Sequence, residues 1–472
     1  MSKAEYPLYQ ALLEQQGTKR HRFHVPAHCV EGGYWYSFDL TELSGLDNLF
    51  APRGCIARAQ ELAAAVFQAD RTYFSVNGSS AGLVAAVSAL CHPGDTILLS
   101  RHSHRSVGAG LILSGARPLF IPVAVDERGI VSGPTVSQVE AALAACDTLP
   151  AAILVTSPNY WGISLDLHSL AACANRAGIP LVVDEAHGGH FIFHPDFPRG
   201  AASAGASIWV NSAHKTLGAL TPGAYLHVRD NGLVDLERLE AALAMWQSSS
   251  PAYPVMLSLD LVRGRLQEHG RALFAGALSL AGRARRRLKK LRRFDLLEQD
   301  DLLPEYGLDP LRLTICWDDP AINGFRLYEW LHRVGRIELE MAGPRYLLAL
   351  INPGLAEQSV AALVEALGRF QDESALSCKP APAVSGHYPL PRQRMTPREA
   401  FDAPAVCIPL LEAGGKISAQ LVTPFPPGVP VLYPGEEITP EFIERLSADL
   451  KAGFNFQELP SERPVSIRVV SA

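Results

Sequence analysis

Residues 208–217 read IWVNSAHKTL, an apolar run that closes with polar side chains and Lys215. Residues 181–188 read LVVDEAHG, so a second apolar run ends at Asp184. Short runs of this kind, rich in Val and Ile, are typical of buried β-strands. The separation of Asp184 from Lys215 fits one strand–helix–strand crossover, which brings the ends of two parallel strands to the same edge of a sheet. The sequence therefore predicts a carboxylate and an amine in one crevice.

The same alternation of strand and helix continues on both sides of this pair. The expected strands are Thr72–Val76, Thr96–Ser100, Arg117–Pro122, Ala152–Thr156, Leu181–Asp184, Ile208–Asn211 and Ala224–Val228, and the expected helices include Gly82–Leu90, Ser137–Ala145 and Leu167–Ala177. This pattern predicts an α/β fold with a mostly parallel central sheet that is covered by helices on both faces. A long helix is expected at 257–294, and a smaller α/β unit follows it, with strands at 312–317 and 345–351 and a helix at 324–334.

Composition narrows the class of protein. The chain has 472 residues, of which 48% are hydrophobic and 19% charged, with a net charge of −6. It is too apolar to be disordered, and it has no global attraction for nucleic acid or an anionic membrane. The basic stretch at 283–293 is expected to be a solvated helix face, although such a stretch can also bind nucleic acid. The absence of a signal-peptide pattern, a membrane-span pattern or paired cysteines predicts a cytoplasmic protein without a metal site.

Lys215 and Asp184 are the strongest chemical signal. A lysine in a charge-poor strand end is desolvated, and its neutral amine is nucleophilic. A buried carboxylate opposite such a lysine suits pyridoxal 5'-phosphate (PLP), because the amine can form a Schiff base while the carboxylate keeps the ring nitrogen protonated. The structural alternative is an Asp that caps a helix and a Lys on the rim.

Two other polar clusters follow expected strands. Residues 76–82, VNGSSAG, offer hydroxyl and backbone N–H groups at a helix N-terminus, which suits a phosphate. The alternative for this cluster is an ordinary helix cap. Residues 101–106, RHSHRS, contain His104, which either lies over a cofactor ring or is a plain loop histidine.

Together these motifs resemble the short-form ornithine/lysine/arginine decarboxylases, which are PLP-dependent enzymes with the aspartate-aminotransferase fold. The segments that carry the resemblance are PLYQALLEQ (7–15), FHVPAH (23–28), DLTELSGLDNL (39–49), AQELAAAVF (59–67), VNGSSAG (76–82), RHSHRSV (101–107), VDEAHGGHF (183–191), SAHKTLGALT (212–221), QSSSPAYPVMLSLD (247–260) and TPFPPGVPVLYPGE (423–436). The resemblance implies PLP-dependent transferase fold type I, with a smaller C-terminal α/β domain or domains after the large domain. It implies an N-terminal arm (1–50), a PLP-binding large domain (51–265), a small α/β domain (266–375), a Pro-rich linker (376–398) and a C-terminal decarboxylase-type domain (399–472).

The resemblance also implies a role for each residue of the site. Lys215 would hold PLP, Asp184 would pair with its ring nitrogen, His104 would stack on the ring and His187 would lie beside it. The residues that would bind the phosphate are Ser79, Ser80, Ser212 and His214. Ser248 and Ser249 would reach the cofactor of a partner subunit, which implies a homodimer or a larger homo-oligomer with shared active sites.

The implied activity is decarboxylation of a basic L-amino acid. Arginine, which would give agmatine for polyamine biosynthesis, is favoured over ornithine and lysine. A cation in a closed pocket needs a carboxylate partner, and a guanidinium favours a bidentate one. The candidate carboxylates are Asp39, Glu42, Asp47, Glu436 and Glu437, with helix capping as the structural alternative for Asp39 and Glu42.

Other activities of the same fold stay open at this stage. An aminotransferase would need an Arg for the substrate α-carboxylate, and Arg345 is a candidate for it. A non-catalytic PLP-fold protein is the other alternative. Two segments depart from the family pattern: residues 26–29 read PAHC where PGHK is usual, and 220–222 read LTP where LTQ is common. The resemblance places both at the substrate entrance, so they bear on substrate identity.

Overall fold

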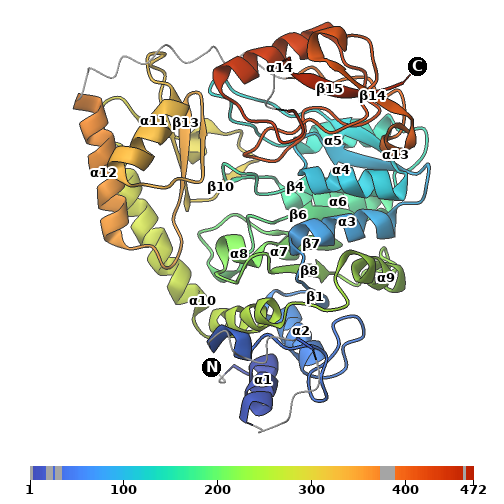
Figure 1. The fold of residues 1–472 in the computed structure, drawn as a ribbon. Helices are drawn as coiled ribbons and strands as arrows, with labels where there is room; N and C mark the ends of the chain where they lie inside the picture. Colours follow the sequence, from blue (N-terminus) through green and yellow to red (C-terminus); the bar gives the residue numbers. More distant parts are fainter. Residues whose placement is uncertain (1–3, 18–24, 27–33, 373–387, 461–463, 472) are drawn as a thin grey trace.

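A seven-stranded sheet forms the centre of the large domain in the computed structural model, which describes residues 4–17, 25–26, 34–372, 388–460 and 464–471 (Figure 1). The strand order is β1-β8-β7-β6-β4-β2-β3. Neighbouring strands are parallel except that β8 runs antiparallel to both β1 and β7. The expected α/β fold with a mostly parallel sheet is confirmed.

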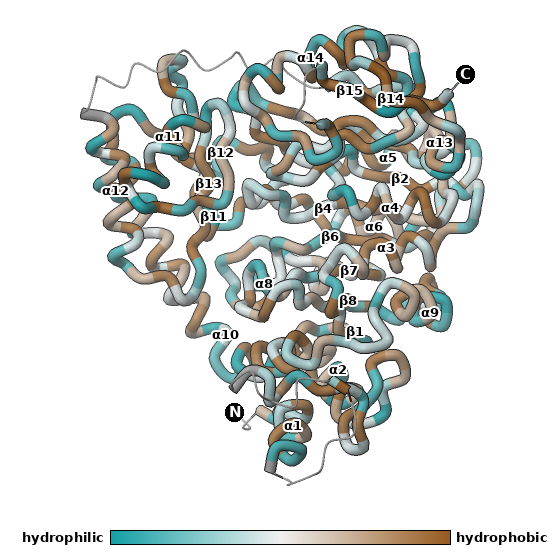
Figure 2. Tube along the Cα trace, in the orientation of Figure 1, coloured by the Kyte–Doolittle hydropathy of each residue, from teal (hydrophilic) through white to brown (hydrophobic). Residues whose placement is uncertain are grey.

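The strands of this sheet lie close to their predicted bounds. They are β1 (Arg71–Ser75), β2 (Thr96–Ser100), β3 (Arg117–Ile121), β4 (Ala152–Thr156), β6 (Leu181–Asp184), β7 (Ile208–Asn211) and β8 (Ala224–Val228). Every residue of β6, β7 and β8 is buried, because helices cover both faces of the sheet. Figure 2 shows hydrophobic residues gathered where these helices pack on the strands.

The helices of the large domain alternate with its strands. They are α2 (Cys55–Val66), α3 (Gly78–Leu90), α4 (Arg105–Ser114), α5 (Val136–Ala144), α6 (Leu167–Ala177), α7 (Ala201–Ala204), α8 (Ala213–Thr216) and α9 (Leu236–Trp246). Helix α3 begins four residues before the predicted start at Gly82, because its first turn consists of Gly, Ser and Ala and carries no apolar periodicity. Helix α1 (Pro7–Gly17) packs against α2 at the N-terminal end of the chain.

Helix α10 (Tyr253–Leu288) is 36 residues long and joins the large and small domains. It runs through the predicted domain boundary at 265/266 without a break. Four basic residues at its C-terminal end are paired within the chain. Arg283 and Arg287 contact Glu357, and Arg285 and Lys289 contact Glu298. These four side chains are therefore engaged within the fold.

The small domain contains a four-stranded antiparallel sheet in the order β12-β13-β11-β9. Its elements are β9 (Asp295–Leu296), β11 (Arg312–Cys316), α11 (Gly324–Trp330), β12 (Met341–Gly343), β13 (Tyr346–Leu350) and α12 (Glu357–Asp372). The helix predicted at 324–334 is α-helical only to Trp330 and continues as a π-helical turn at Leu331–Gly335. A two-stranded ribbon of β5 (Ile163–Ser164) and β10 (Gly307–Leu308) connects this domain to the large one.

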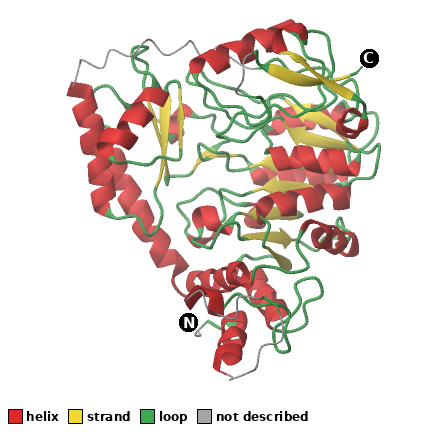
Figure 3. Ribbon diagram, viewed as in Figure 1, coloured by secondary structure: helices red, strands yellow, loops and turns green. Residues whose placement is uncertain are grey.

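The C-terminal segment forms a third unit, with α13 (Pro397–Asp402), β14 (Ala405–Pro409), α14 (Pro440–Ala452) and β15 (Ser466–Val470). It has its own apolar core, which includes Phe442 and Ile467. Figure 3 shows this unit beside both the central sheet and the small domain. Of the linker predicted at 376–398, residues 376–387 lie outside the described residues.

Candidate active site

The side chains of Asp184 and Lys215, on which the fold prediction was based, lie at one edge of the central sheet. Asp184 is the last residue of β6, and Lys215 is in α8, directly after β7. Strands β6 and β7 are parallel neighbours, with Asp184 opposite Val210 in the register. Parallel pairing therefore brings the carboxylate and the amine into one crevice, as predicted.

Asp184 is buried with few partners. Its exposed fraction is 3%, and among the described residues its carboxylate accepts one hydrogen bond, from the backbone N–H of Ala186 at 3.2 Å. Burial raises its pKa, against the lowering effect of the nearby Lys215 charge. A buried carboxylate with acceptor capacity to spare fits the protonated ring nitrogen of PLP.

Lys215 is held by a chain of polar contacts that begins in the small domain. Its Nζ lies 3.1 Å from Nε2 of His187, and Nη2 of Arg312 lies 2.8 Å from Nδ1 of the same ring. A guanidinium can only donate, so Nδ1 must accept from Arg312. Neutral His187 then carries its proton on Nε2 and donates it to Lys215 Nζ. An amine that accepts this bond is neutral, which is the nucleophilic form of lysine.

The pKa shifts agree with this assignment. Burial lowers the pKa of Lys215, the Arg312 charge lowers it further, and Asp184 and Glu340 oppose the effect. The pKa of His187 lies well below its ordinary value because of burial and the Lys215 and Arg312 charges. Both shifts favour the uncharged forms of Lys215 and His187.

Arg312 is fixed from behind by Asp309. The Nε of Arg312 lies 3.7 Å from Oδ2 of Asp309, and Nε2 of His190 lies 3.1 Å from the same oxygen. All three side chains are almost fully buried. The Tyr160 ring closes the other side, with its centroid 4.5 Å from that of His187 and 5.8 Å from Lys215 Nζ.

The predicted phosphate-binding residues gather beside this lysine. The Ser212 hydroxyl donates to the Ser79 hydroxyl at 2.7 Å, so the start of α8 meets the start of α3. Ser80 is exposed on the same turn of α3, and Nδ1 of His214 donates to the Gly223 carbonyl at 3.1 Å. Gly78 has φ +78°, a conformation that favours glycine, and so turns the chain from β1 into α3. The free N–H groups of this helix start and the two hydroxyls fit a phosphate.

His104 caps α4 and faces the same crevice. Its Nδ1 accepts from the backbone N–H of Ser106 at 3.2 Å, and burial, with the Lys215 charge, lowers its pKa to about 4. The C-terminal segment covers it: a Cβ on Gly428 would lie 3.3 Å from Nε2 of His104, and the Gly428 carbonyl accepts from the N–H of Arg105 at 3.0 Å. A neutral, fixed imidazole is therefore available to a cofactor ring.

The sequence profile of the Orn/Lys/Arg decarboxylase major domain matches residues 6–317, and that of the C-terminal domain of the same enzymes matches residues 383–452. The chain belongs to the Orn/Lys/Arg decarboxylase family. It is therefore an amino-acid decarboxylase, and its substrate is a basic amino acid. The aminotransferase and non-catalytic alternatives, with Arg345 as a carboxylate ligand, are not supported.

Relatives of this decarboxylase match over most or all of its length. The arginine decarboxylase of Bacillus subtilis is 36% identical to this chain. The alignment covers 100% of this chain and 99% of that protein. The lysine decarboxylase of Pseudomonas aeruginosa is 24% identical over 92% of this chain and 74% of its own. The structure of the constitutive lysine decarboxylase of Escherichia coli gives a TM-score of 0.86 at 20% identity, with 99% of this chain and 82% of that chain covered. The fold is that of PLP-dependent fold type I enzymes.

The acidic residues predicted to hold the substrate cation mostly have other partners in this decarboxylase. The Asp47 carboxylate accepts from backbone N–H groups between residues 48 and 57 at the start of α2; burial would raise its pKa, but these bonds lower it overall. Glu436 is fully buried and pairs with Arg101, and Glu437 pairs with Arg394 at 2.7 Å. These contacts favour structural roles for the three residues.

Four predicted contributors are not brought to Lys215 within the part of the chain that the structure describes. Ser248 and Ser249 are exposed after α9, and Glu42 accepts from the neighbouring Thr41 hydroxyl near the half-buried Asp39. In FHVPAH, only residues 25–26 are described, and the other four lie outside the described residues.

Sequence reasoning missed Arg312, Asp309, His190 and Glu340. Asp309 and Arg312 lie in DPLRLT at 309–314, where charged residues interrupt the start of an apolar strand. That interruption was the signal in the sequence for functional residues. Among the described residues there is no cluster of three or more metal-binding side chains. None of the described helices has the length and hydrophobicity needed to cross a membrane.

Proposed function

We propose that this decarboxylase uses PLP to convert L-arginine into agmatine and CO₂, as a step in polyamine biosynthesis. The observation that carries the proposal is that Lys215 and buried Asp184 share one crevice, in a chain whose full-length relatives include arginine decarboxylases. The residues that would hold PLP are Lys215, Asp184, His104, His187, Ser79, Ser80, Ser212 and His214.

The residues of the chain divide the work as follows. When bound, PLP supplies an electron sink for the pair left at Cα after CO₂ departs. Asp184 holds a proton on the ring nitrogen, and a buried carboxylate does this strongly because little water competes with it. Lys215 Nζ would hold the cofactor and would act as the nucleophile that frees the product amine from it. Lys215 or His104, which share the crevice, returns a proton to Cα.

We also propose a cytoplasmic homodimer, or a larger homo-oligomer, with shared active sites. Ser248 and Ser249 are exposed, which is the arrangement expected if they complete the site of a partner.

The test is to incubate the purified protein and PLP separately with arginine, ornithine and lysine, and to measure CO₂ and product masses. The expected result is fastest turnover with arginine, with agmatine and CO₂ in equal amounts, and none with Lys215→Ala. Faster turnover of lysine or ornithine, or a keto acid without CO₂, would contradict the proposal.

A further inference from the structure

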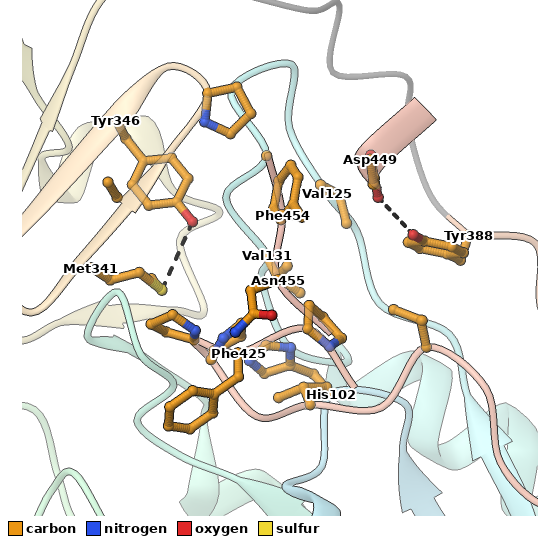
Figure 4. Close-up of a pocket in the computed structure, with 18 of the residues that line it drawn as sticks. His102, Val125, Val131, Met341, Tyr346, Tyr388, Phe425, Asp449, Phe454 and Asn455 are labelled. Atoms are coloured by element: carbon orange, nitrogen blue, oxygen red, sulfur yellow. Dashed lines mark hydrogen bonds between the residues drawn. The ribbon is translucent and has the colours of Figure 1, made fainter. Parts of the chain in front are cut away.

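Two cavities of the structure differ in what they reach. The first, of about 400 Å³, lies where the large, small and C-terminal domains meet, and its largely apolar walls include Phe425 and Phe454 (Figure 4). The second, of about 530 Å³, has exposed residues at its rim, among them Arg199, and the buried Glu185 in its wall. Glu185 directly follows Asp184 in the chain, so the second cavity leads from the surface to the residue next to Asp184.

The side chain of Glu185 has a specific place in the fold. It is 4% exposed, its Oε1 accepts from the backbone N–H of Ala201 at 2.7 Å, and its Oε2 accepts from Nδ2 of Asn211 at 2.9 Å. Two glycines leave room for it, because a Cβ on Gly188 would lie 2.8 Å from its Cγ and a Cβ on Gly200 would lie 2.8 Å from its Oε1. Buried polar groups are stable when they are paired in this way.

Asn211 belongs to a hydrogen-bonded chain that runs across neighbouring strands. Its Nδ2 also donates to the Glu185 carbonyl at 3.0 Å, so its Oδ1 is the acceptor that faces Nε2 of His227 at 3.0 Å. Nε2 of His227 therefore carries a proton, and Nδ1 accepts from the Thr72 hydroxyl at 2.8 Å. This imidazole is neutral, since burial lowers its pKa to about 3. The donors point from β1 through β8 and β7 toward Glu185, at the end of β6.

This chain holds the turn that carries Asp184. Among the described residues, the Asp184 carboxylate accepts one hydrogen bond, from the N–H of Ala186 in the same turn. The Glu185 carbonyl accepts from Asn211 and from the N–H of Gly188 at 3.0 Å, so the turn is tied to β7 through Glu185. The position of Asp184 therefore depends on Glu185.

The charges of Asp184 and Glu185 are also coupled. Burial raises the pKa of Glu185 to about 7, and the Asp184 charge adds to this effect, while the two hydrogen bonds oppose it. A protonated ring nitrogen would neutralise Asp184, so the pKa of Glu185 would fall and its proton would pass to solvent through the cavity. The other titratable or charged groups on the elements around Glu185 are His187, His190, His194, Arg199, His227 and Arg271.

We propose that Glu185 positions Asp184 for PLP and gives up a proton to solvent when PLP binds, so that its negative charge helps to keep the proton on the ring nitrogen. The inference rests on the proposed function, because it assumes that PLP lies at Asp184. The cavity gives the proton a route to the surface, and the donors of Asn211 and Ala201 stabilise the carboxylate that remains. Glu185 acts through Asp184 and is a positioning residue.

The test measures proton release when PLP binds to the cofactor-free protein at pH 7. Calorimetry in two buffers with different ionisation enthalpies gives the number of protons released, without any need for turnover. A group with a pKa near 7 is half protonated at this pH, so Glu185→Gln should release about half a proton fewer than wild type. Nitrogen NMR of isotope-labelled PLP should show that the ring loses its proton about one pH unit lower in the variant, because a neighbouring negative charge is missing.

The matched control is Asp260→Asn. Asp260 is also a buried carboxylate, but it lies in α10, accepts from the backbone N–H of Leu8 at 3.1 Å and pairs with Arg263. This change of a carboxyl to an amide should lower stability and keep the wild-type proton release and ring-nitrogen titration. Equal proton release by wild type and Glu185→Gln would overturn the proposal, as would an unchanged ring-nitrogen titration in that variant.

A measurement on the wild type covers the case in which Glu185→Gln does not fold. Infrared spectra of protein with isotope-labelled glutamate should show a protonated glutamic acid whose carbonyl band is lost when PLP binds. Persistence of this band, or its absence before PLP is added, would overturn the proposal.

Failure of the proposed function gives a different result. PLP binding with the expected proton release, but without turnover of any basic amino acid, would refute the proposed function and still support the role of Glu185. Absence of PLP binding to the wild type would refute both.

Discussion

Replacement of Arg312 by Met should slow the capture of PLP by the cofactor-free enzyme. The side chain donates to Nδ1 of His187 over 2.8 Å, and it alone among the described contacts obliges the Nε2–H form that faces Lys215. A hydrogen bond from a charged donor contributes about 1.5–3 kcal/mol, which corresponds to a factor of about 10 to 150. We therefore expect the rate of PLP capture at pH 7 to decrease by a factor in this range.

The pH profile should move as well. Burial and the Arg312 charge both lower the pKa of Lys215. Without Arg312, the pKa of Lys215 rises, and a smaller fraction of the amine is neutral at a given pH. The capture rate of Arg312→Met should therefore need a higher pH to reach its maximum, and the nitrogen NMR signals of His187 should show loss of the single tautomer.

Two further variants separate this role from damage to the fold. Arg312→Met leaves Asp309 buried beside His190, and breaking a buried pair costs about 3–5 kcal/mol of stability. The Arg312→Met/Asp309→Asn double variant removes that charge and should recover stability without recovering capture. Arg312→Lys keeps a cationic donor and should recover part of the rate. If Arg312→Met, correctly folded, captures PLP at the wild-type rate with the wild-type pH profile, the reasoning fails.

Three other outcomes are expected. Borohydride should fix PLP to Lys215 as a stable adduct, and its recovery on another lysine by peptide mass mapping would refute the site. Asp184→Asn should lower kcat by about 10²–10³-fold, because it removes electrostatic stabilisation of about 3–4 kcal/mol in a buried site, and kinetics with saturating PLP measure this. A mixture of inactive Lys215→Ala chains with inactive Ser248→Ala/Ser249→Ala chains should regain part of the activity after subunit exchange, and no recovery would indicate sites built from a single chain.

The sequence predicted the elements whose environment is uniform along the chain. Strands β6 and β7 are buried from end to end, so they read as unbroken apolar runs with bounds that match the structure. Asp184 and Lys215 end those runs, which is why their proximity followed from the crossover length. The start of α3 at Gly78 was missed because Gly and Ser are weak helix formers, and here the first turn is held by its surroundings.

Long-range partners were not predictable in the same way. Arg312 and Glu340 reach the site through the packing of a separate sheet, and no local pattern specifies which strand will face Lys215. The role of Asp47 was also hidden, since its carboxylate is taken up by backbone N–H groups that any sequence would supply. The sequence alone does not show whether an acidic residue near a motif already accepts hydrogen bonds from backbone N–H groups.

The unbroken course of α10 has a consequence for how the enzyme works over time. A continuous α-helix is stiff, so the 36 residues of α10 form a rigid connection between the large and small domains. Arg312 and His187 meet across these two domains, so a substitution that breaks α10, far from the site, should also loosen this contact and slow the capture of PLP.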